Sequence, residues 1–372
     1  MRVEKINVYQ AVMTLHKPFR IAYGETREAK TVFIEVVTDT GVNGWGEAPP
    51  TSKITGETVD TVVGAIRLMA GSLYDLDITG YMDVYRVIDS TLRSNQAAKD
   101  GLITAILDAV GKSLGIPLYK LLGGGGNVIR SDVTIGLDSP EAMARDAVSW
   151  VERGFRAIKV KLGGPLEVDF ERVRMIRDSI GAGVEIRVDA NQAWSPKEAL
   201  RASRVLERYD VAIIEQPVHY RDYEGLRTVK WGSSIPIIAD ESVHTSRDAA
   251  LLASMEAVDG VNVKIAKSGG MLEGLRIASV AEAFGLDLMV GCMVESPLGI
   301  AAAAHMVAAH GGFKYIDLDS DLMLSDHPVR DSFRRERDEI ILGEKPGLGV
   351  EVDVGKLVKL AEIRVSKPQP AI

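Results

Sequence analysis

Cysteine, long apolar runs and blocks of positive charge are scarce or missing in this sequence. Cys292 is the only cysteine, so no internal disulfide can form, and we expect a reducing, cytoplasmic environment. No run approaches the roughly 18 apolar residues of a membrane span, and the charged first ten residues do not resemble a signal peptide. With a formal net charge of −8 and no Lys/Arg block alternating with aromatic residues, the sequence also argues against binding nucleic acid.

Nucleotide and zinc motifs are missing as well. The sequence contains no P-loop and no GxGxxG followed by an acidic ribose ligand, and the glycine run at 123–126 lacks the Lys-Ser/Thr that cradles phosphate. The six histidines show no metal-ligand spacing, and we expect His305 and His310 to be packing or surface residues.

The length of the chain, 372 residues with 46% hydrophobic content, favours one long domain and a smaller one. Residues 1–126 form the predicted α+β domain: β structure up to residue 50, with a hairpin turning at 38–41 and a loop at 20–30, is followed by helical patterns over 57–122. The glycines at 123–126 mark the predicted boundary. We expect the tail, 322–372, to return to β structure and pack on this first domain.

The stretch between, 127–321, is dominated by a repeat of strand and helix patterns. Five short apolar segments each end in a charged residue, at intervals of 24 to 28 residues. Further strands are predicted at 131–137, 286–291 and 313–319, which gives eight strands separated by seven helices. A parallel α/β barrel carries its chemistry at the carboxyl ends of its strands. The five charged strand ends are Lys161, Asp189, Glu215, Asp240 and Lys264.

The lysines are predicted to point into the barrel mouth. Lys159 and Lys161 share one face of their strand, although both faces of a parallel barrel strand are normally apolar. The alternative is an amphipathic edge strand with two solvated lysines. Lys264 shares a face with Asn262, and we favour it as a base over Lys267, which either contacts substrate or sits in the loop before the next helix.

The carboxylates Asp189, Glu215 and Asp240 predict a metal site. Oxygen ligands without His or Cys favour Mg²⁺, with Mn²⁺ as a substitute, although any single carboxylate here would more often be a helix cap or a surface charge. Asn191 lies on the same face as Asp189 and is expected to support it.

Asp317 and Asp319 share a face of the eighth predicted strand. We interpret them as a pair that binds a cationic group, such as an ammonium, at the barrel mouth. The alternative is a solvated acidic strand end.

Several motifs resemble those of the enolase superfamily, in its muconate-lactonizing-enzyme subgroup. They are KVK (159–161), VDANQAW (188–194), IIEQP (213–217), ADES (239–242), VKIAKSGG (263–270) and PGLGVEVD (346–353). The resemblance implies a (β/α)7β modified TIM barrel capped by an α+β domain built from the N-terminal region and the C-terminal tail. It also implies that Asp189, Glu215 and Asp240 bind Mg²⁺ and that Lys161 and Lys264 form the acid/base pair.

Within that subgroup, the sequence over 291–305 and the Asp317-Leu318-Asp319 motif look most like the dipeptide epimerases, in which the Asp-x-Asp pair holds the α-ammonium of the substrate. One departure concerns Gly24, because Ala-Glu epimerases carry an arginine at the corresponding position. The resemblance therefore favours a non-acidic dipeptide, such as a hydrophobic one. The implied substrate-binding residues are Lys159, Asp317, Asp319, Thr134, Met293, Tyr23 and Gly24, with Asn191 and Lys267 in supporting positions.

The chemistry implied is a 1,1-proton transfer at the α-carbon of the C-terminal residue of an L,L-dipeptide, through an enediolate. Lys161 and Lys264 lie four strands apart in a ring of eight, so they face each other across the mouth, which predicts inversion. Enolase-superfamily sites are a known case of a Lys or His base beside Mg²⁺. Bringing a lysine pKa from about 10.4 to about 7 costs roughly 4–5 kcal/mol, and we expect the cation and the neighbouring lysines to act in that direction.

Other functions use the same type of site. The alternatives are an o-succinylbenzoate synthase, an N-acylamino acid racemase or a muconate cycloisomerase, whose substrates lack the free amine that Asp317 and Asp319 would bind. A more remote alternative is a catalytically silent barrel that binds a ligand. The expected partner is a small molecule, and we expect a homo-oligomer.

Overall fold

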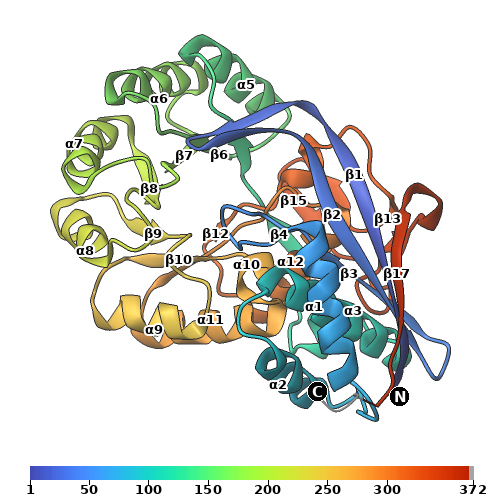
Figure 1. Ribbon diagram of the computed structural model, residues 1–372. Coiled ribbons are helices and arrows are strands. Elements are labelled where there is room, and N and C mark those ends of the chain that lie inside the picture. Colours follow the sequence, from blue (N-terminus) through green and yellow to red (C-terminus); the bar gives the residue numbers. More distant parts are fainter. Residues whose placement is uncertain (368–372) are drawn as a thin grey trace.

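The chain folds around an eight-stranded parallel sheet that curls into a barrel, as the computed structural model shows for the described residues, 1–367 (Figure 1). The strands pair in chain order, and the ring closes where the Asp132 N–H donates to the Ile316 carbonyl at 2.8 Å. The strands are β5 (Val133–Ile135), β6 (Ala157–Lys161), β7 (Glu185–Asp189), β8 (Val211–Glu215), β9 (Ile237–Ala239), β10 (Gly260–Val263), β11 (Asp287–Val290) and β12 (Tyr315–Ile316). The predicted α/β barrel is confirmed.

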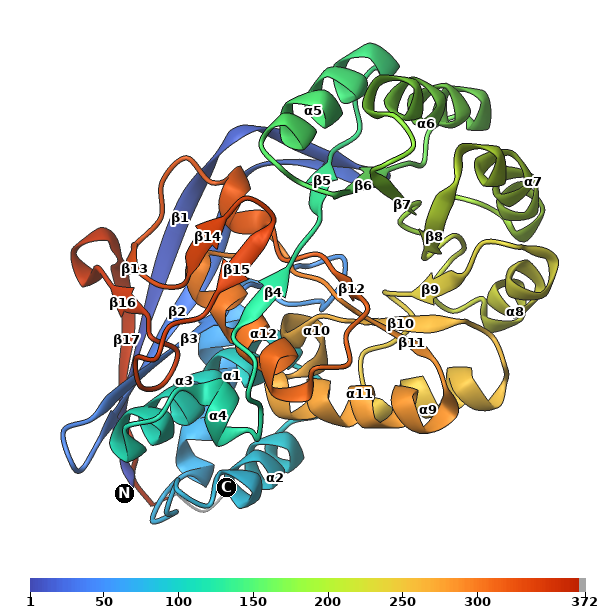
Figure 2. The same ribbon diagram turned by 180° about the vertical axis from the view of Figure 1, so that it is seen from behind.

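Helices connect successive strands and surround the barrel (Figures 1 and 2). One of them begins with a capping box, because Ser195 accepts a hydrogen bond from the Glu198 N–H and Pro196 is the first helical residue. The connecting helices are α5 (Pro140–Glu152), α6 (Leu166–Ile180), α7 (Pro196–Leu206), α8 (Tyr223–Gly232), α9 (Ser246–Ser254), α11 (Met271–Phe284) and α12 (Pro297–His310), with the short α10 (Ile265–Ser268) and η1 (Glu207–Tyr209). The short η2 (Ser320–Met323) follows the last strand.

The inside of the barrel explains why charged residues collect at its mouth. Ile213, Ile238, Met289 and Tyr315 form a buried apolar cluster contributed by four different strands. Because side chains alternate along a strand, Glu215 lies on the same face of β8 as Ile213, two residues further toward the carboxyl end. The apolar cluster therefore closes the barrel below the polar strand ends.

The N-terminal region is an antiparallel sheet covered by helices. Its predicted hairpin at 38–41 is confirmed by the pairing of the second and third strands. The sheet and helix α3 approach closely, since a Cβ on Gly46 would lie 2.0 Å from the Gly101 carbonyl oxygen. The elements are β1 (Val3–Ile21), β2 (Gly24–Thr38), β3 (Asn43–Ala48), α1 (Val59–Ser72), α2 (Tyr81–Thr91), α3 (Gln96–Leu114) and α4 (Leu118–Leu121).

The predicted loop at 20–30 is wrong, because nearly all of it belongs to β1 and β2. Ile21 pairs with Gly24, so the chain turns over only two residues, and Arg20 pairs with Glu25 across the strands. The Arg20 Nε lies 2.5 Å from Glu25 Oε2. Cross-strand pairs of this kind stabilise a ribbon whose polar composition resembles that of a loop.

The tip of this β1–β2 ribbon rests on the barrel. The Leu137 N–H donates to the Arg20 carbonyl at 2.8 Å, just beyond β5. Gly163 follows β6 with a φ of +120°, and a Cβ there would lie 2.6 Å from the Ala22 Cβ. The ribbon thus approaches the barrel closely at its carboxyl-end loops.

The C-terminal tail adds strands to two sheets and forms a third, two-stranded sheet by itself. Its last strand pairs antiparallel with β1, and another pairs with β4 (Val128–Arg130), ahead of the barrel. The tail elements are β13 (Val329–Asp331), β14 (Arg334–Glu336), β15 (Glu339–Ile341), β16 (Glu351–Val352), η3 (Val354–Lys356) and β17 (Val358–Arg364). The predicted domain limits stay predictions, and the last five residues of the predicted tail lie outside the described residues. Among residues 1–367, no helix combines the length and apolarity needed to cross a membrane.

A buried carboxylate joins the N-terminal sheet to the barrel. Glu47, on β3, accepts hydrogen bonds from the N–H and hydroxyl of Ser296 and from the Gly299 N–H, at 2.5 to 3.2 Å. These donors lie at the start of α12, where free N–H groups favour an anion. The contact fixes α12 against the sheet.

Candidate active site

Three carboxylates meet at the mouth of the barrel. Asp189 ends β7, Glu215 ends β8 and Asp240 directly follows β9, and one oxygen of each lies within 4.8 Å of the others. All three side chains are buried, so their charges need a cation or hydrogen bonds to offset them. An all-oxygen set of this kind fits Mg²⁺. The structure thus brings together the three predicted ligands.

Two lysines reach this centre from different sides of the ring. Lys161 Nζ, from β6, lies 2.6 Å from Asp189 Oδ2, and Lys264 Nζ, just after β10, lies 2.8 Å from Asp240 Oδ2. Three strands separate β6 from β10 on one side. Both lysines line the same cavity, so they can act on a common ligand from different directions.

The pKa of Lys264 depends on the charges around it. Burial lowers this pKa, but Asp240, Glu215 and Asp189 outweigh burial and raise it well above its usual value. The positive charge of Lys159 lowers the pKa of Lys264, as the sequence predicts for neighbouring lysines, but this effect is smaller than that of Asp240. A divalent cation held by the same carboxylates would offset the negative charge that keeps Lys264 protonated.

Lys159 lies deeper than its neighbour Lys161. Its Nζ is 2.7 Å from both Asp317 Oδ2 and Glu215 Oε2, and the residue is 1% exposed. It does not line the cavity that the predicted substrate-binding aspartates line. From this position Lys159 links the metal-site carboxylates to Asp317.

Asp317 and Asp319 lie side by side against Thr134. The Thr134 hydroxyl lies 3.0 Å from Asp317 Oδ1, to which it donates, and the Thr134 N–H donates to Asp319 Oδ2 at 2.5 Å. Burial and the charge of Asp317 raise the pKa of Asp319 to about 7. Burial acts on Asp317 in the same direction, but Lys159 and Lys161 outweigh it and hold the pKa of Asp317 below its usual range. The pair gives the cavity a negatively charged wall.

Lys267 supports the centre without reaching the cavity. Its Nζ donates to the carbonyl oxygens of Asp240, Val243 and Asn262 at 2.7, 2.5 and 2.8 Å. The same Nζ lies 3.1 Å from Asp240 Oδ1, and the residue is fully buried. The sequence left two roles open for Lys267. Its burial away from the cavity argues against contact with the substrate, and the residue instead holds Asp240 in place.

Asn191 takes its predicted place beside Asp189, whose Oδ1 accepts the Asn191 N–H at 2.8 Å. Its side-chain amide donates to Glu241 Oε1 at 3.2 Å, and the same oxygen accepts the Tyr23 hydroxyl at 3.2 Å. These bonds tie the tip of the β1–β2 ribbon to the barrel mouth. Glu241 was missed by the sequence reasoning, although it directly follows the metal-ligand candidate Asp240.

Asn262 was also missed as a functional residue. Its side-chain amide donates to Glu215 Oε1 at 2.8 Å, which orients this carboxylate. The sequence could have indicated this role, because Asn262 and Lys264 are two residues apart and therefore lie on the same face of the predicted strand.

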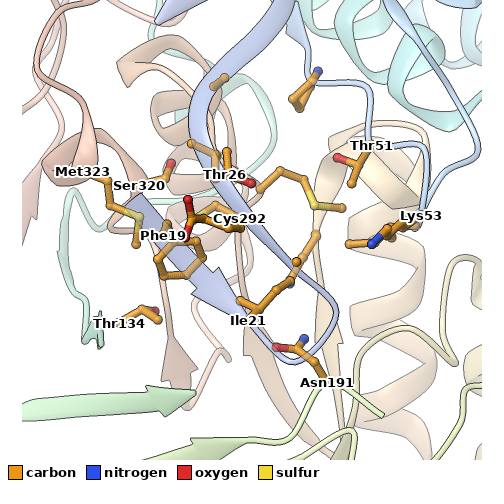
Figure 3. Close-up of a pocket in the computed structure, with 18 of the residues that line it drawn as sticks. Phe19, Ile21, Thr26, Thr51, Lys53, Thr134, Asn191, Cys292, Ser320 and Met323 are labelled. Carbon is orange, nitrogen blue, oxygen red and sulfur yellow. The ribbon is translucent and has the colours of Figure 1, made fainter. Parts of the chain in front are cut away.

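The lysines and the aspartate pair open onto a cavity of about 520 Å³. Six of the seven predicted substrate-binding residues line it, and Lys159 is the exception; the six are Tyr23, Gly24, Thr134, Met293, Asp317 and Asp319. Figure 3 shows Phe19 and Ile21, from the β1–β2 ribbon, in the same cavity as Thr134 and Asn191 from the barrel. The ribbon and the barrel together therefore enclose the space next to the charged centre.

Known proteins share this architecture. Residues 4–123 match the N-terminal domain model of mandelate racemase and muconate lactonizing enzyme, and residues 142–356 match the model described as enolase C-terminal domain-like. The L-Ala-D/L-Glu epimerase of Clostridium acetobutylicum is 37% identical over 354 residues, which cover 94% of this chain and 99% of that protein.

The names of two further relatives mention their substrates, and one of them was crystallised with a metal. The hydrophobic dipeptide epimerase of Enterococcus faecalis is 37% identical over 352 residues, or 94% of this chain and 99% of that protein. A crystal structure of the dipeptide epimerase from Cytophaga hutchinsonii, complexed with Mg and D-Ala-L-Val, superimposes with a TM-score of 0.94 at 34% identity. That match covers 98% of this chain and 100% of that one.

Proposed function

The chain belongs to the mandelate racemase and muconate lactonizing enzyme family of the enolase superfamily, and we propose that it is a Mg²⁺-dependent dipeptide epimerase. One observation carries the proposal: a single cavity is lined by two lysines from separate sides of the barrel and by a pair of aspartates. The dipeptide epimerases among its relatives support it. The reaction inverts the α-carbon of the C-terminal residue of an L,L-dipeptide.

Lys161 and Lys264 perform the proton transfer. One Nζ, in its neutral form, removes the α-proton from one face of the carbon, and the ammonium of the other lysine delivers a proton to the opposite face. The electrons of the broken C–H bond move into the substrate carboxylate, which gives an enediolate. Inversion follows because the two amines approach from β6 and β10, on opposite sides of the ring.

Asp189, Glu215 and Asp240 would hold Mg²⁺, which supplies positive charge where the substrate carboxylate gains negative charge. Asn262 and Lys267 keep two of these carboxylates in position through the bonds to Glu215 and Asp240 described above. Tyr23 and the ribbon that carries it cover the centre and limit the access of water.

Asp317 and Asp319 bind the free amine of the dipeptide. Both are buried carboxylates that line the cavity, and the ammonium of the substrate offsets their charge. N-acylated amino acids have no such ammonium, so the pair favours a dipeptide over the substrates of the alternative enzymes.

We also propose that the enzyme works in the cytoplasm as a homo-oligomer. The cytoplasm is suggested by the single cysteine and by the small-molecule substrate.

A panel of L,L-dipeptides incubated with the enzyme and Mg²⁺ in D₂O tests the function. We expect deuterium to enter the α-position of the C-terminal residue while the L,D epimer accumulates. The absence of exchange in every dipeptide would refute the proposal.

A further inference from the structure

A lysine stands beside Gly24 in the cavity. Lys53 lies in the loop between β3 and α1, and its Nζ is 3.6 Å from the point where a Cβ on Gly24 would stand. The ammonium donates to the Tyr23 carbonyl and lies 5.5 Å from the centre of the Tyr23 ring. The N–H groups of the three residues after Lys53, 54 to 56, donate hydrogen bonds to the Thr51 carbonyl at 2.8 to 3.2 Å and form a turn that holds the loop in place.

The charge of Lys53 is not neutralised by the protein. Of the lysines that line the cavity, Lys161 and Lys264 pair with the metal-site carboxylates, and Lys30 Nζ lies 3.1 Å from Glu28 Oε1. Within residues 1–367, Lys53 forms no ion pair with a carboxylate.

Glu25, the other acidic residue of the ribbon that lines the cavity, is already paired. Arg20 Nε lies 2.5 Å from one of its oxygens and Arg27 Nε lies 2.7 Å from the other. Lys53 is therefore a cation in the cavity that remains available to a ligand.

The position of Lys53 suits the side chain of the C-terminal residue. In the view of Figure 3, Lys53 and Thr51 lie on one side of the cavity, and Ser320 and Met323 lie on the other. Ser320 directly follows Asp319, so the substrate amine belongs to that second side. A dipeptide held there by its amine extends its other end toward Lys53.

We propose that Lys53 binds an acidic side chain on the C-terminal residue of the substrate, as a specificity-determining residue. This inference rests on the proposed dipeptide epimerase function. It reverses the preference for a non-acidic dipeptide that the sequence suggested from Gly24, because the positive charge comes from a different loop and occupies the space beside Gly24.

A comparison of L-Ala-L-Glu with L-Ala-L-Gln tests this role, since the two dipeptides differ chiefly in the charge of the side chain. We expect the wild-type enzyme to favour L-Ala-L-Glu in kcat/KM. In Lys53→Met the ratio of the two kcat/KM values should fall about twofold to fivefold, as expected for a charge pair made by an exposed lysine. Lys30→Met removes the same charge from the same cavity, but from a lysine paired with Glu28, and should leave the ratio unchanged.

A second variant separates recognition from a structural role. Adding Gly24→Arg to Lys53→Met places a cation in the space that Lys53 vacates. Within residues 1–367, and apart from Gly24 and its two chain neighbours, Lys53 Nζ is the only heavy atom within 4 Å of the point where a Cβ on Gly24 would stand. We expect this double variant to recover the preference for L-Ala-L-Glu.

An unchanged ratio in Lys53→Met, or an equal loss on both dipeptides, would overturn the role of Lys53. Turnover of L-Ala-L-Gln by the wild type without a preference for L-Ala-L-Glu would overturn it too, while leaving the epimerase function standing. If the wild type turned over no dipeptide in the wider panel, the proposed function would fail and this inference with it.

Discussion

Lys159 and Asp317 form a buried ion pair, with 2.7 Å between Nζ and Oδ2, and the same ammonium lies 2.7 Å from Glu215 Oε2. One lysine thus connects the carboxylate proposed to bind the substrate amine to a carboxylate of the proposed metal site. A change at Asp317 would therefore disturb both. Asp319 makes no ion pair with Lys159, so it is the cleaner position at which to test binding of the amine.

Asp319→Asn should reduce kcat/KM for dipeptides and spare substrates without a free amine. The amide keeps the shape of the side chain but loses the charge that offsets the ammonium, so we expect a loss of about tenfold to a hundredfold for a buried charge-assisted hydrogen bond. The measurement is kcat/KM for a dipeptide and for its N-acetyl derivative, assayed side by side. A variant that loses activity on both equally would show that Asp319 has only a structural role.

The activity on dipeptides should depend on pH near neutrality. Because the pKa of Asp319 is raised to about 7, the carboxyl group is neutral below pH 7 and charged above it. We expect kcat/KM, which reports ionisation of the free enzyme, to rise as the pH passes upward through 7 at saturating Mg²⁺. In Asp319→Asn this rise should disappear. A profile in the variant that matches the wild type would assign the ionisation to another group.

Chelation of divalent cations should abolish activity, and added Mg²⁺ should restore it. Mg²⁺ should also stabilise the folded chain, by about 2.7 kcal/mol at a hundredfold excess over its Kd. The readout is the Tm with and without the ion. Glu215→Gln should lose most of the Tm increase, whereas Glu152→Gln, at an exposed position on α5, should retain it. An equal increase in both variants would place the bound ion elsewhere.

Lys267→Met should destabilise the fold strongly. The substitution removes a donor from three buried carbonyl oxygens, of which that of Asp240 keeps a second donor, the Val243 N–H, and it removes a counter-charge from Asp240. Breaking a buried pair of this type costs about 3–5 kcal/mol. Urea unfolding measures the loss, and Lys197→Met, on the exposed face of α7, should change the stability by only about 0.5 kcal/mol. A change at Lys267 as small as the one at Lys197 would contradict this reading of its hydrogen bonds.

The barrel and its charged centre could be predicted because both follow from local patterns. Asp189 and Glu215 each end a short apolar strand, and the carboxyl ends of parallel strands gather at one edge. The same pattern predicts the two lysines and the aspartate pair, since alternation within a strand decides which residues face inward.

Contacts between distant segments could not be predicted in the same way. The ribbon tip carries no Asn-Gly or Gly-Gly turn, and its strands depend on pairs such as Arg20 with Glu25, so its polar sequence resembles a loop. Lys53 lies outside every motif and reaches the cavity only because its loop packs beside Gly24. The depth of Lys159 likewise depends on its partner Asp317, at the far end of the barrel sequence.

Proton exchange in single-lysine variants tests the opposed roles of Lys161 and Lys264 most directly. Lys161→Met and Lys264→Met should each lose about 10²- to 10⁴-fold in epimerisation, the usual contribution of a general acid or base. Each variant should still exchange the α-proton of one epimer with D₂O, because the remaining lysine can remove and return a proton on its own face. We predict that one variant exchanges only the L,L-dipeptide and the other only the L,D epimer. Exchange of the same epimer by both variants, or epimerisation by either at the wild-type rate, would contradict the account.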